Sequence, residues 1–385
     1  MSSRRRPSAL WLWSSPEASR ALRTRDLAEI LRTYRRLNSL SQERLAQLLG
    51  YDKTYISMIE TRRRVINDVG TLRHIAHALG IPVHALGVTE SDDATFAAMM
   101  QFAESVLSLA EIARKTGHAS DAVNELWPLV ARLEARSAEG FMERDSLFVL
   151  ARARLSLGVA LGTLLPDEKL TSAAKWTGQA LIIAERLGEP DLTTHTLTMH
   201  GNELRKAGRV AAAIVRLQRA VVRSTDAGSR ATACAMLARA AGEAGHAELF
   251  DVTMNDYRHQ LDQAPDAGML ANEFTFREVQ LRGLAATGRA ALAARLLSQS
   301  DAPNAPVAPQ WAVIERITIG DVLLAIDDPE GAEEALLAGL RGAESFRLPH
   351  QVQRAVRIAT AGRLDAVTEA EHALIIRLAA LGTDR

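Results

Sequence analysis

The stretch from Ser41 to Glu60 constrains the fold of this chain more than any other, because it reads as two short helices joined by a tight turn. Ser41 can cap the first helix and Asp52 the second, while Gly50 stands where a residue with positive φ would end the first helix. Apolar residues recur at helical spacing in both helices: Leu45, Leu48 and Leu49, then Ile56 and Ile59. Ala46 supplies the small contact that two steeply crossing helices need near their turn.

This spacing of a small residue, a glycine four positions later and aliphatic residues ten and thirteen positions later is that of a helix-turn-helix. An ordinary helical hairpin on a protein surface is the alternative. Amphipathic patterns at 27–31 and 72–79 favour the first interpretation, because they predict a compact bundle of four or five helices from about Asp26 to Leu86.

The segment resembles the Xre/Cro-type family of DNA-binding domains. The residues that carry this resemblance are Gln42, Leu45, Ala46, Gly50, Tyr55, Ile56, Ser57, Ile59, Glu60, Leu72, Ile75, Ala76 and 78–82. Three positions depart from the usual pattern of the family: Lys53 where glutamine is common, Met58 where arginine or lysine is common, and Arg62 where glycine is common. These departures put the operator sequence in doubt rather than the fold.

We predict that this head contacts double-stranded DNA through one set of residues: Gln42, Lys53, Thr54, Tyr55, Ser57, Met58, Arg62, Arg63 and Arg64. Lys53 and Thr54 begin the second helix, the end that points into the major groove in this motif. Lys53 can donate to guanine O6 and N7, and Thr54 offers a hydroxyl or a methyl group to a base edge. Met58 could cover a thymine methyl group or face the neighbouring helix instead. The three arginines follow the helix, where phosphate contact is expected.

The distribution of charge supports this prediction. The chain has no net charge, yet residues 1–87 contain 15 Lys and Arg against 7 Asp and Glu, which leaves 31 against 39 for residues 88–385. A basic head on an acidic body fits a head that meets nucleic acid. Chance asymmetry is the alternative, but the basic excess overlaps the helix-turn-helix.

Beyond the head the sequence repeats. Small, large, turn, small, large and small residues stand at offsets of 0, 3, 7, 12, 16 and 19 in the clearest unit: Gly201, Leu204, Gly208, Ala213, Leu217 and Ala220. This unit resembles the tetratricopeptide family, and the same offsets recur from Ala110, Leu281 and Gly320. With the weaker copies around 161–181 and 238–249, hairpin turns are expected near 117, 166, 208, 245, 288 and 328. The pattern favours a solenoid over a plain helical bundle.

The predicted fold is therefore all-α, with an N-terminal four- or five-helix bundle followed by a tetratricopeptide-like α-solenoid. The expected boundaries are a flexible basic N-terminal arm at 1–20, the helix-turn-helix domain at 21–87, a linker at 88–95 and the repeat domain at 96–385. Arg4 to Arg6 could contact phosphates or remain solvated. Trp11 and Trp13 are expected to pack on the neighbouring domain.

Other classes of function find little support. The single cysteine, Cys234, excludes an intramolecular disulfide framework and reads as a buried structural thiol. Neither the pair His74 and His77 nor the pair His195 and His200 completes a metal-ligand set. No nucleotide-binding, metalloprotease or serine-hydrolase motif is present, so we predict no enzyme and no cofactor. No apolar run is expected to reach the length of a membrane helix, which predicts a cytoplasmic protein without a membrane partner.

These observations predict a transcriptional regulator whose head reads operator DNA in the major groove and whose body forms a homodimer. The family resemblance implies that a ligand, often a peptide, sets the DNA-binding state of such regulators; a protein or small-molecule effector is also open. Four polar residues are candidates for the inner face of the solenoid, although each could instead be solvated: Asn202, Arg205, Asn272 and Arg282. The alternative is a tetratricopeptide-type interaction scaffold whose head no longer binds DNA specifically. The sequence leaves open the operator, the target genes, and whether binding represses or activates.

Overall fold

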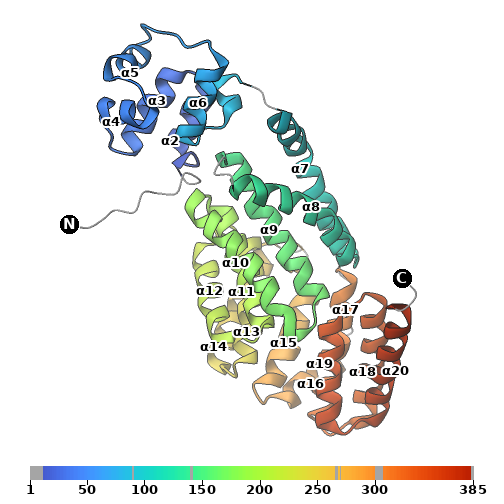
Figure 1. Cartoon of the computed structure of the whole chain (residues 1–385). Coiled ribbons are helices and arrows are strands. Elements are labelled where there is room, and N and C mark those ends of the chain that lie inside the picture. The colour runs from blue at the N-terminus through green and yellow to red at the C-terminus, as the bar shows by residue number, and fades with distance from the viewer. Residues whose placement is uncertain are drawn as a thin grey trace, which may run out of the picture. The chain divides into compact units, whose positions relative to one another are not determined.

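The computed structural model of the chain describes residues 12–88, 91–138, 142–264, 268, 270–299 and 307–382, without the side chains of 91–94 and 375–382. Within these residues the chain forms 19 α-helices, two 3-10 helices and no strand, apart from one isolated bridge between Gly268 and Ala271 (Figure 1). The predicted all-α class is therefore confirmed. Two compact units are present, one holding the chain up to Leu107 with 127–153 and the other holding 108–126 with 154–385.

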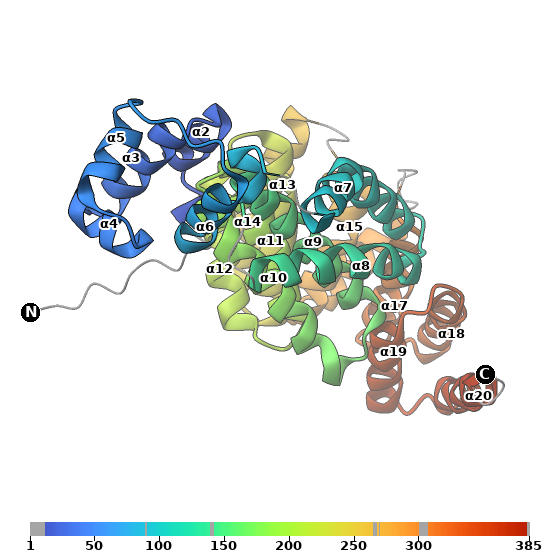
Figure 2. The ribbon, with the colours of Figure 1, turned by 45° about the horizontal axis from the view of Figure 1, so that its top comes forward.

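The head of the first unit contains five α-helices, in agreement with the predicted bundle (Figure 2). They are α2 (Pro16–Thr24), α3 (Leu27–Leu37), α4 (Gln42–Leu49), α5 (Lys53–Glu60) and α6 (Val69–Leu79), followed by the 3-10 helix η1 (Val83–Leu86). Their apolar faces form one core, whose most buried members include Ile30, Leu31, Leu45, Leu49, Ile56 and Ile75. Such a shared core fixes the angle between α4 and α5, which is what a groove-binding hairpin requires.

The folded head begins inside the segment that the sequence predicted as a flexible arm. Helix α2 begins at Pro16, with the Ser15 side chain accepting a hydrogen bond from Ala18 N at 3.1 Å. The Trp13 side chain is 1% exposed, and its indole N–H donates to the backbone oxygen of Leu79 at 3.0 Å. A buried indole whose N–H is satisfied anchors the segment from residue 12 onward. The predicted roles of Arg4 to Arg6 and Trp11 lie outside the described residues.

The expected linker at 88–95 also differs from the structure, because helix α7 (Ser91–Lys115) begins inside it. Serine and aspartate, which are common in linkers, are equally favoured in the first turn of a helix. The first unit also includes parts of α8 (Ala119–Ala138) and α9 (Arg144–Leu164). Polar contacts of the described residues join the start of α9 and the preceding Glu143 to the head, among them Arg144 Nη1 to Ser14 O at 3.1 Å, His84 to Glu143 at 2.5 Å, and Arg23 to Asp145 at 3.5 Å.

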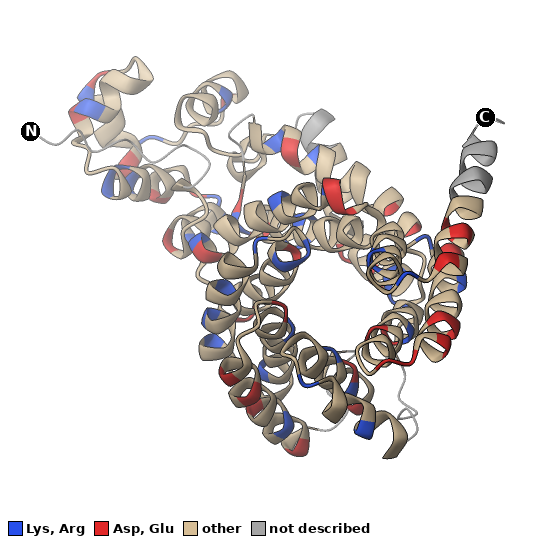
Figure 3. Cartoon of the chain, turned by 90° about the horizontal axis from the view of Figure 1, so that it is seen from below, with Lys and Arg blue, Asp and Glu red and all other residues tan. Residues whose placement is uncertain are grey.

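The second unit consists of successive helical hairpins, as the repeat pattern predicted. After α9 come η2 (Asp167–Lys169), α10 (Leu170–Leu187), α11 (Pro190–Lys206), α12 (Val210–Arg223), α13 (Ala227–Glu243), α14 (Ala247–Gln263), α15 (Glu273–Ala286), α16 (Ala290–Gln299), α17 (Pro309–Leu324), α18 (Pro329–Ser345), α19 (Pro349–Gly362) and α20 (Asp365–Gly382). All six predicted turns fall between helices, and those at Gly117, Gly208, Gly245 and Gly288 have φ between 71° and 88°. In Figure 3 the helices of this unit surround a common axis.

The small residues of the repeat explain how the hairpins close. A Cβ atom built on Gly201 would lie 2.5 Å from Leu217 Cγ, and one built on Gly320 would lie 2.7 Å from Leu336 Cγ. Both pairs stand at offsets 0 and 16 of the repeat, so the same close contact recurs in two hairpins. The leucine fills the space that the glycine leaves, which is the interdigitation that close packing demands.

The expectation that no apolar segment reaches the length of a membrane helix does not hold for two helices. Thr95–Lys115 and Arg144–Leu164 are long and apolar enough to cross a membrane by length and composition alone. This is weak evidence, because a buried core helix passes the same test, and most of the second segment is buried. The first is mostly exposed, with Phe102, Leu109 and Ile112 all more than half accessible. Cys234 is buried, as predicted.

Candidate functional site

The start of α5 is held by the caps that the sequence predicted. Ser41 accepts a hydrogen bond from Arg44 N at 3.1 Å, and Asp52 accepts one from Tyr55 N at 2.7 Å. Between them Gly50 ends α4 in the left-handed conformation, with φ of 72°. The two helices therefore have defined ends and a short, fixed connection, so the first turn of α5 keeps its direction when it meets a partner.

The outward face of α5 carries the predicted reading residues. Lys53 and Thr54 lie in its first turn and are exposed. Ser57 and Met58 are half-buried one turn further on, and Tyr55 is half-buried with its ring centroid 4.7 Å from that of Tyr51. The side chains best able to enter a groove are therefore the first two, while the others lie closer to the body of the head.

A buried carboxylate joins α3, α4 and α5 behind this face. The Glu60 side chain is 3% exposed and accepts hydrogen bonds from Arg35 Nε at 2.6 Å and Arg35 Nη2 at 2.9 Å. Gln42 Nε2 donates to the same carboxylate at 2.8 Å. The hydrogen bond to Glu60 raises the pKa of Arg35. The amide of Gln42, predicted as a DNA contact, is thus engaged inside the head. Arg35 was not predicted, because its partner lies 25 residues away in the chain.

The three arginines after α5 have different surroundings. Arg62 adopts φ of 59° and donates from Nε and Nη2 to one oxygen of Asp26, at 3.0 and 2.5 Å. This left-handed backbone explains why glycine would suit the position. The guanidinium of Arg64 lies 4.5 Å from the centroid of the Tyr55 ring. Arg63 is exposed, and its side chain has no ion-pair partner in the part of the chain that the structure describes. Of the three, Arg63 is therefore the side chain most available to a phosphate.

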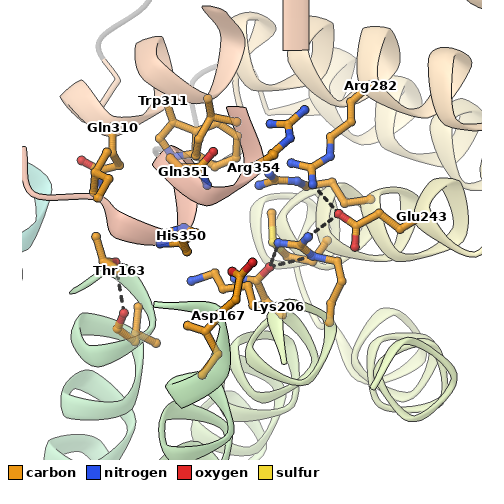
Figure 4. A pocket seen from close by; sticks show the side chains of 18 of the residues that line it. Thr163, Asp167, Lys206, Glu243, Arg282, Gln310, Trp311, His350, Gln351 and Arg354 are labelled. Carbon is orange, nitrogen blue, oxygen red and sulfur yellow. Dashed lines mark hydrogen bonds and ion pairs between the residues drawn. The ribbon is translucent and has the colours of Figure 1, made fainter. Parts of the chain in front are cut away.

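The second unit contains a cavity of about 490 Å³ (Figure 4). Its charged lining is mostly cationic: Arg114, Arg205, Lys206, Arg239, Arg282, Arg354 and Arg357 against Asp167 and Glu243. Three of the four predicted ligand-binding residues, Asn202, Arg205 and Arg282, are among the lining residues. Asn272 is not among them, and its side chain instead caps α15 by accepting a hydrogen bond from Thr275 N at 2.9 Å.

One carboxylate, Glu243, lies among the arginines that form the cationic wall of the cavity: Arg205, Arg239, Arg282 and Arg354. Glu243 pairs with Arg205 and with Arg282, each at 2.5 Å. Burial alone would raise the pKa of Glu243, but these arginines lower it to about 2. Burial lowers the pKa of Arg354 to about 9, with Arg282 adding to the effect, and burial among cations lowers the pKa of His350 to about 3. At pH 7 the His350 ring is therefore neutral while Arg354 keeps its charge, so the wall stays positive although it is buried.

The sequence missed Glu243, Arg239, Arg354 and Trp311 as lining residues. Each lies on the first helix of a hairpin, so the repeat pattern locates its helix but not the direction in which its side chain points. No group of three or more His, Cys, Asp or Glu side chains is placed to hold a metal ion among the residues described.

Comparison with known proteins identifies the head. A family model described as a helix-turn-helix domain matches residues 26–86. The control protein C.SmaI of Serratia marcescens is 43% identical over 60 residues, which cover 16% of this chain and 70% of that protein.

Two solved structures are similar over a longer part of the chain. One is Bacillus thuringiensis PlcR in complex with the peptide PapR7 and DNA, with 13% identity, a TM-score of 0.35 and coverage of 86% of this chain and 99% of that one. The other is BtubC (BKLC) from P. vanneervenii, with 16% identity, a TM-score of 0.35 and coverage of 60% and 91%.

Proposed function

Because this chain belongs to the helix-turn-helix family of DNA-binding transcriptional regulators, we propose that it reads operator DNA with α5 in the major groove. The observation that carries this proposal is the exposure of Lys53 and Thr54 at the capped start of α5. Lys53 donates to guanine O6 and N7, and Thr54 contacts a neighbouring base edge. Ser57 and Met58 contact the edges of the same groove.

The phosphates are bound next to this reading surface. Arg63 carries the main contact, because its guanidinium is exposed and has no ion-pair partner among the described residues. Arg62 and Arg64 shape the loop through Asp26 and Tyr55 and present their remaining N–H groups to the backbone. Tyr55 lies at the edge of this surface, and Gln42 helps to position α5 through its hydrogen bond to Glu60.

Two heads are needed for a specific site, since one small head contacts few base pairs. We therefore propose that the body forms a homodimer. Exposed apolar side chains on the part of α7 that belongs to the second unit, Leu109 and Ile112, support a second copy of the chain as its partner. Light scattering at micromolar concentration tests this: the unchanged chain is dimeric, Leu109→Asp is monomeric, and Val222→Asp, at an exposed position on α12, remains dimeric. A monomeric unchanged chain would contradict the proposal.

The cavity of the second unit takes the effector in this proposal. Its volume is in the range of small-molecule sites, and burial of its charged wall costs free energy that a bound ligand can offset. A ligand that binds one conformation of the body better than another shifts the DNA affinity by that difference.

Selection of bound sequences from a random double-stranded library tests the central part of this proposal. The full chain should enrich one motif with two half-sites about one helical turn apart, and the chain's own upstream region should contain it. Recovery of no preferred sequence would favour the interaction scaffold instead. Lys53→Ala serves as the matched variant, since it should lose the preference at one position of each half-site.

A further inference from the structure

The cationic wall of the cavity is not neutralised by the protein itself. Arg239 is 5% exposed and Arg354 is 9% exposed, yet neither forms an ion pair within the described part of the chain. Arg354 Nη2 donates to Thr318 at 3.0 Å, whereas neither Arg354 Nη1 nor Arg239 Nε has a hydrogen-bond partner among the residues that the structure describes. Most buried N–H groups in folded proteins are paired, so two such guanidinium groups in one wall require an explanation.

The nearby carboxylates do not supply the missing acceptors. Glu243 is already shared by Arg205 and Arg282. Glu278 is fully buried and lies close enough to influence the charges of Arg239 and Arg354, but among the described residues its carboxylate accepts a hydrogen bond from Thr318 alone, at 3.0 Å. Asp321 also lies close enough to influence the charge of Arg354, but it forms no ion pair with it among the described residues. Four arginines thus face three carboxylates, and an excess of positive charge remains in a buried place where an unpaired charge is costly.

We propose that this cavity binds a small organic dianion, seated against Arg239 and Arg354, with its apolar part beside Trp311. Carboxylates and phosphate monoesters share the oxyanion chemistry that planar guanidinium groups bind in paired hydrogen bonds. The inference rests on the proposed function only in treating the cavity as the effector site.

The remaining lining fits such a ligand. The guanidinium of Arg239 lies 4.9 Å from the Trp311 ring centroid, which holds it on the wall. Met236 and Ile314 add apolar surface beside it. In Figure 4, Arg282 and Arg354 gather with Glu243 on one side of the cavity, and Gln351 and Trp311 lie next to them. The Gln351 amide oxygen is buried, has no partner within the described part of the chain, and can accept from a ligand hydroxyl or N–H group.

Isothermal titration of the full chain at pH 8 tests the proposal with four probes. Phenyl phosphate and phenylsuccinate are dianions with the same ring, 2-phenylethanol is their neutral counterpart, and inorganic phosphate lacks the ring. Saturable binding of one dianion, with 2-phenylethanol at least tenfold weaker, is the expected result. The dianion that binds identifies the phosphate or the dicarboxylate as the source of the oxyanion.

Three variants separate this site from the rest of the chain. Arg354→Gln and Arg239→Gln should each weaken the dianion about tenfold, as loss of one charged hydrogen bond requires. Arg295→Gln, at an exposed position on α16, should bind unchanged. Because each cavity variant removes an unpaired buried charge, its Tm without ligand should be no lower than that of the unchanged chain.

The proposal is overturned if no dianion binds saturably, if 2-phenylethanol binds as tightly, or if both cavity variants bind like Arg295→Gln. A gel shift with the selected operator is recorded in parallel. Dianion binding without any change in DNA affinity would leave this inference standing and contradict the effector role, whereas operator binding without dianion binding would contradict this inference alone.

Discussion

The two regions of the molecule treat buried charge in opposite ways. In the head, the carboxylate of Glu60 accepts two hydrogen bonds from Arg35 and one from Gln42. In the body, Arg239 and Arg354 are buried with N–H groups that no acceptor meets among the described residues. Since an unmet buried charge costs free energy, the Glu60 network of the head is complete before the head binds anything, whereas the cavity of the body is not.

The two regions also differ in where the cations of their proposed sites lie. Lys53 and Arg63 point cations outward from the head, where a polyanion can approach from solvent. The body also places cations around a cavity of about 490 Å³, a volume that suits a small ligand. The proposed DNA-binding surface is thus an exposed face of the head, whereas the proposed anion site is a cavity of the body.

The largest effect should come from breaking the completed network of the head. Glu60→Gln leaves Arg35 without its carboxylate, and loss of one partner from a buried pair costs about 3–5 kcal/mol. The free energy of unfolding from urea titration, followed by circular dichroism, measures this loss. Glu43→Gln, an exposed position on the neighbouring helix α4, is the control. Equal stability of the two variants would mean that Glu60 contributes no more than a surface carboxylate.

A second prediction uses a buried histidine of the body. Burial, with Arg216 nearby, lowers the pKa of His200 to about 4. Above pH 7 the ring is neutral in both states, but below about 6.5 the unfolded chain gains a proton that the folded chain does not, so stability falls until about pH 4. Between pH 8 and pH 5 this loss should be about 2 kcal/mol. Urea titrations at both values measure it.

The matched variants for this prediction are His200→Gln and His259→Gln, the latter at an exposed position on α14. The first should remove about 2 kcal/mol of the pH-dependent loss, and the second should leave it in place. If the two variants show the same dependence on pH, burial of the His200 ring is not its source.

A third prediction contrasts the glycines of the two regions. Gly201→Ala in the body would place a methyl group 2.5 Å from Leu217 Cγ, and such overpacking costs about 1–3 kcal/mol. Gly50→Ala in the head has nothing within 4 Å, so it costs only the left-handed conformation, about 1 kcal/mol. Adding Leu217→Val should recover part of the first loss. A double variant less stable than the sum of its single changes would contradict the packing explanation.

The sequence predicted what depends on local spacing. The caps at Ser41 and Asp52, the positive φ at Gly50 and the six hairpin turns follow from residue types a few positions apart. The sequence did not predict contacts between residues that lie far apart in the chain. Trp13 finds its acceptor at Leu79, 66 residues away, and Arg35 finds Glu60 25 residues away, so neither the start of the head nor its buried network could be read from local pattern.

The cavity shows the same limit. Arg205 and Arg282 were predicted because polar residues on first helices stand out in a repeat, and both line the cavity. Asn272 stood out equally but caps a helix. Arg239 lies on α13, where alanines dominate, and its inward direction depends on the packing of neighbouring hairpins. The repeat pattern gives the order of the helices, and only their packing decides which side chains meet.

In the proposed function, α5 reads sequence while Arg63 anchors the head to phosphate. Fluorescence anisotropy tests both roles at once. It measures the affinity for the selected operator and for its single-base variants, each at several salt concentrations. Lys53→Ala should cost about 1–3 kcal/mol on the operator and relax the preference at one base position. Arg63→Ala should weaken all sequences alike and reduce the slope of log affinity against log salt by about 1. If both substitutions lower affinity uniformly and leave base preference unchanged, α5 does not read the operator.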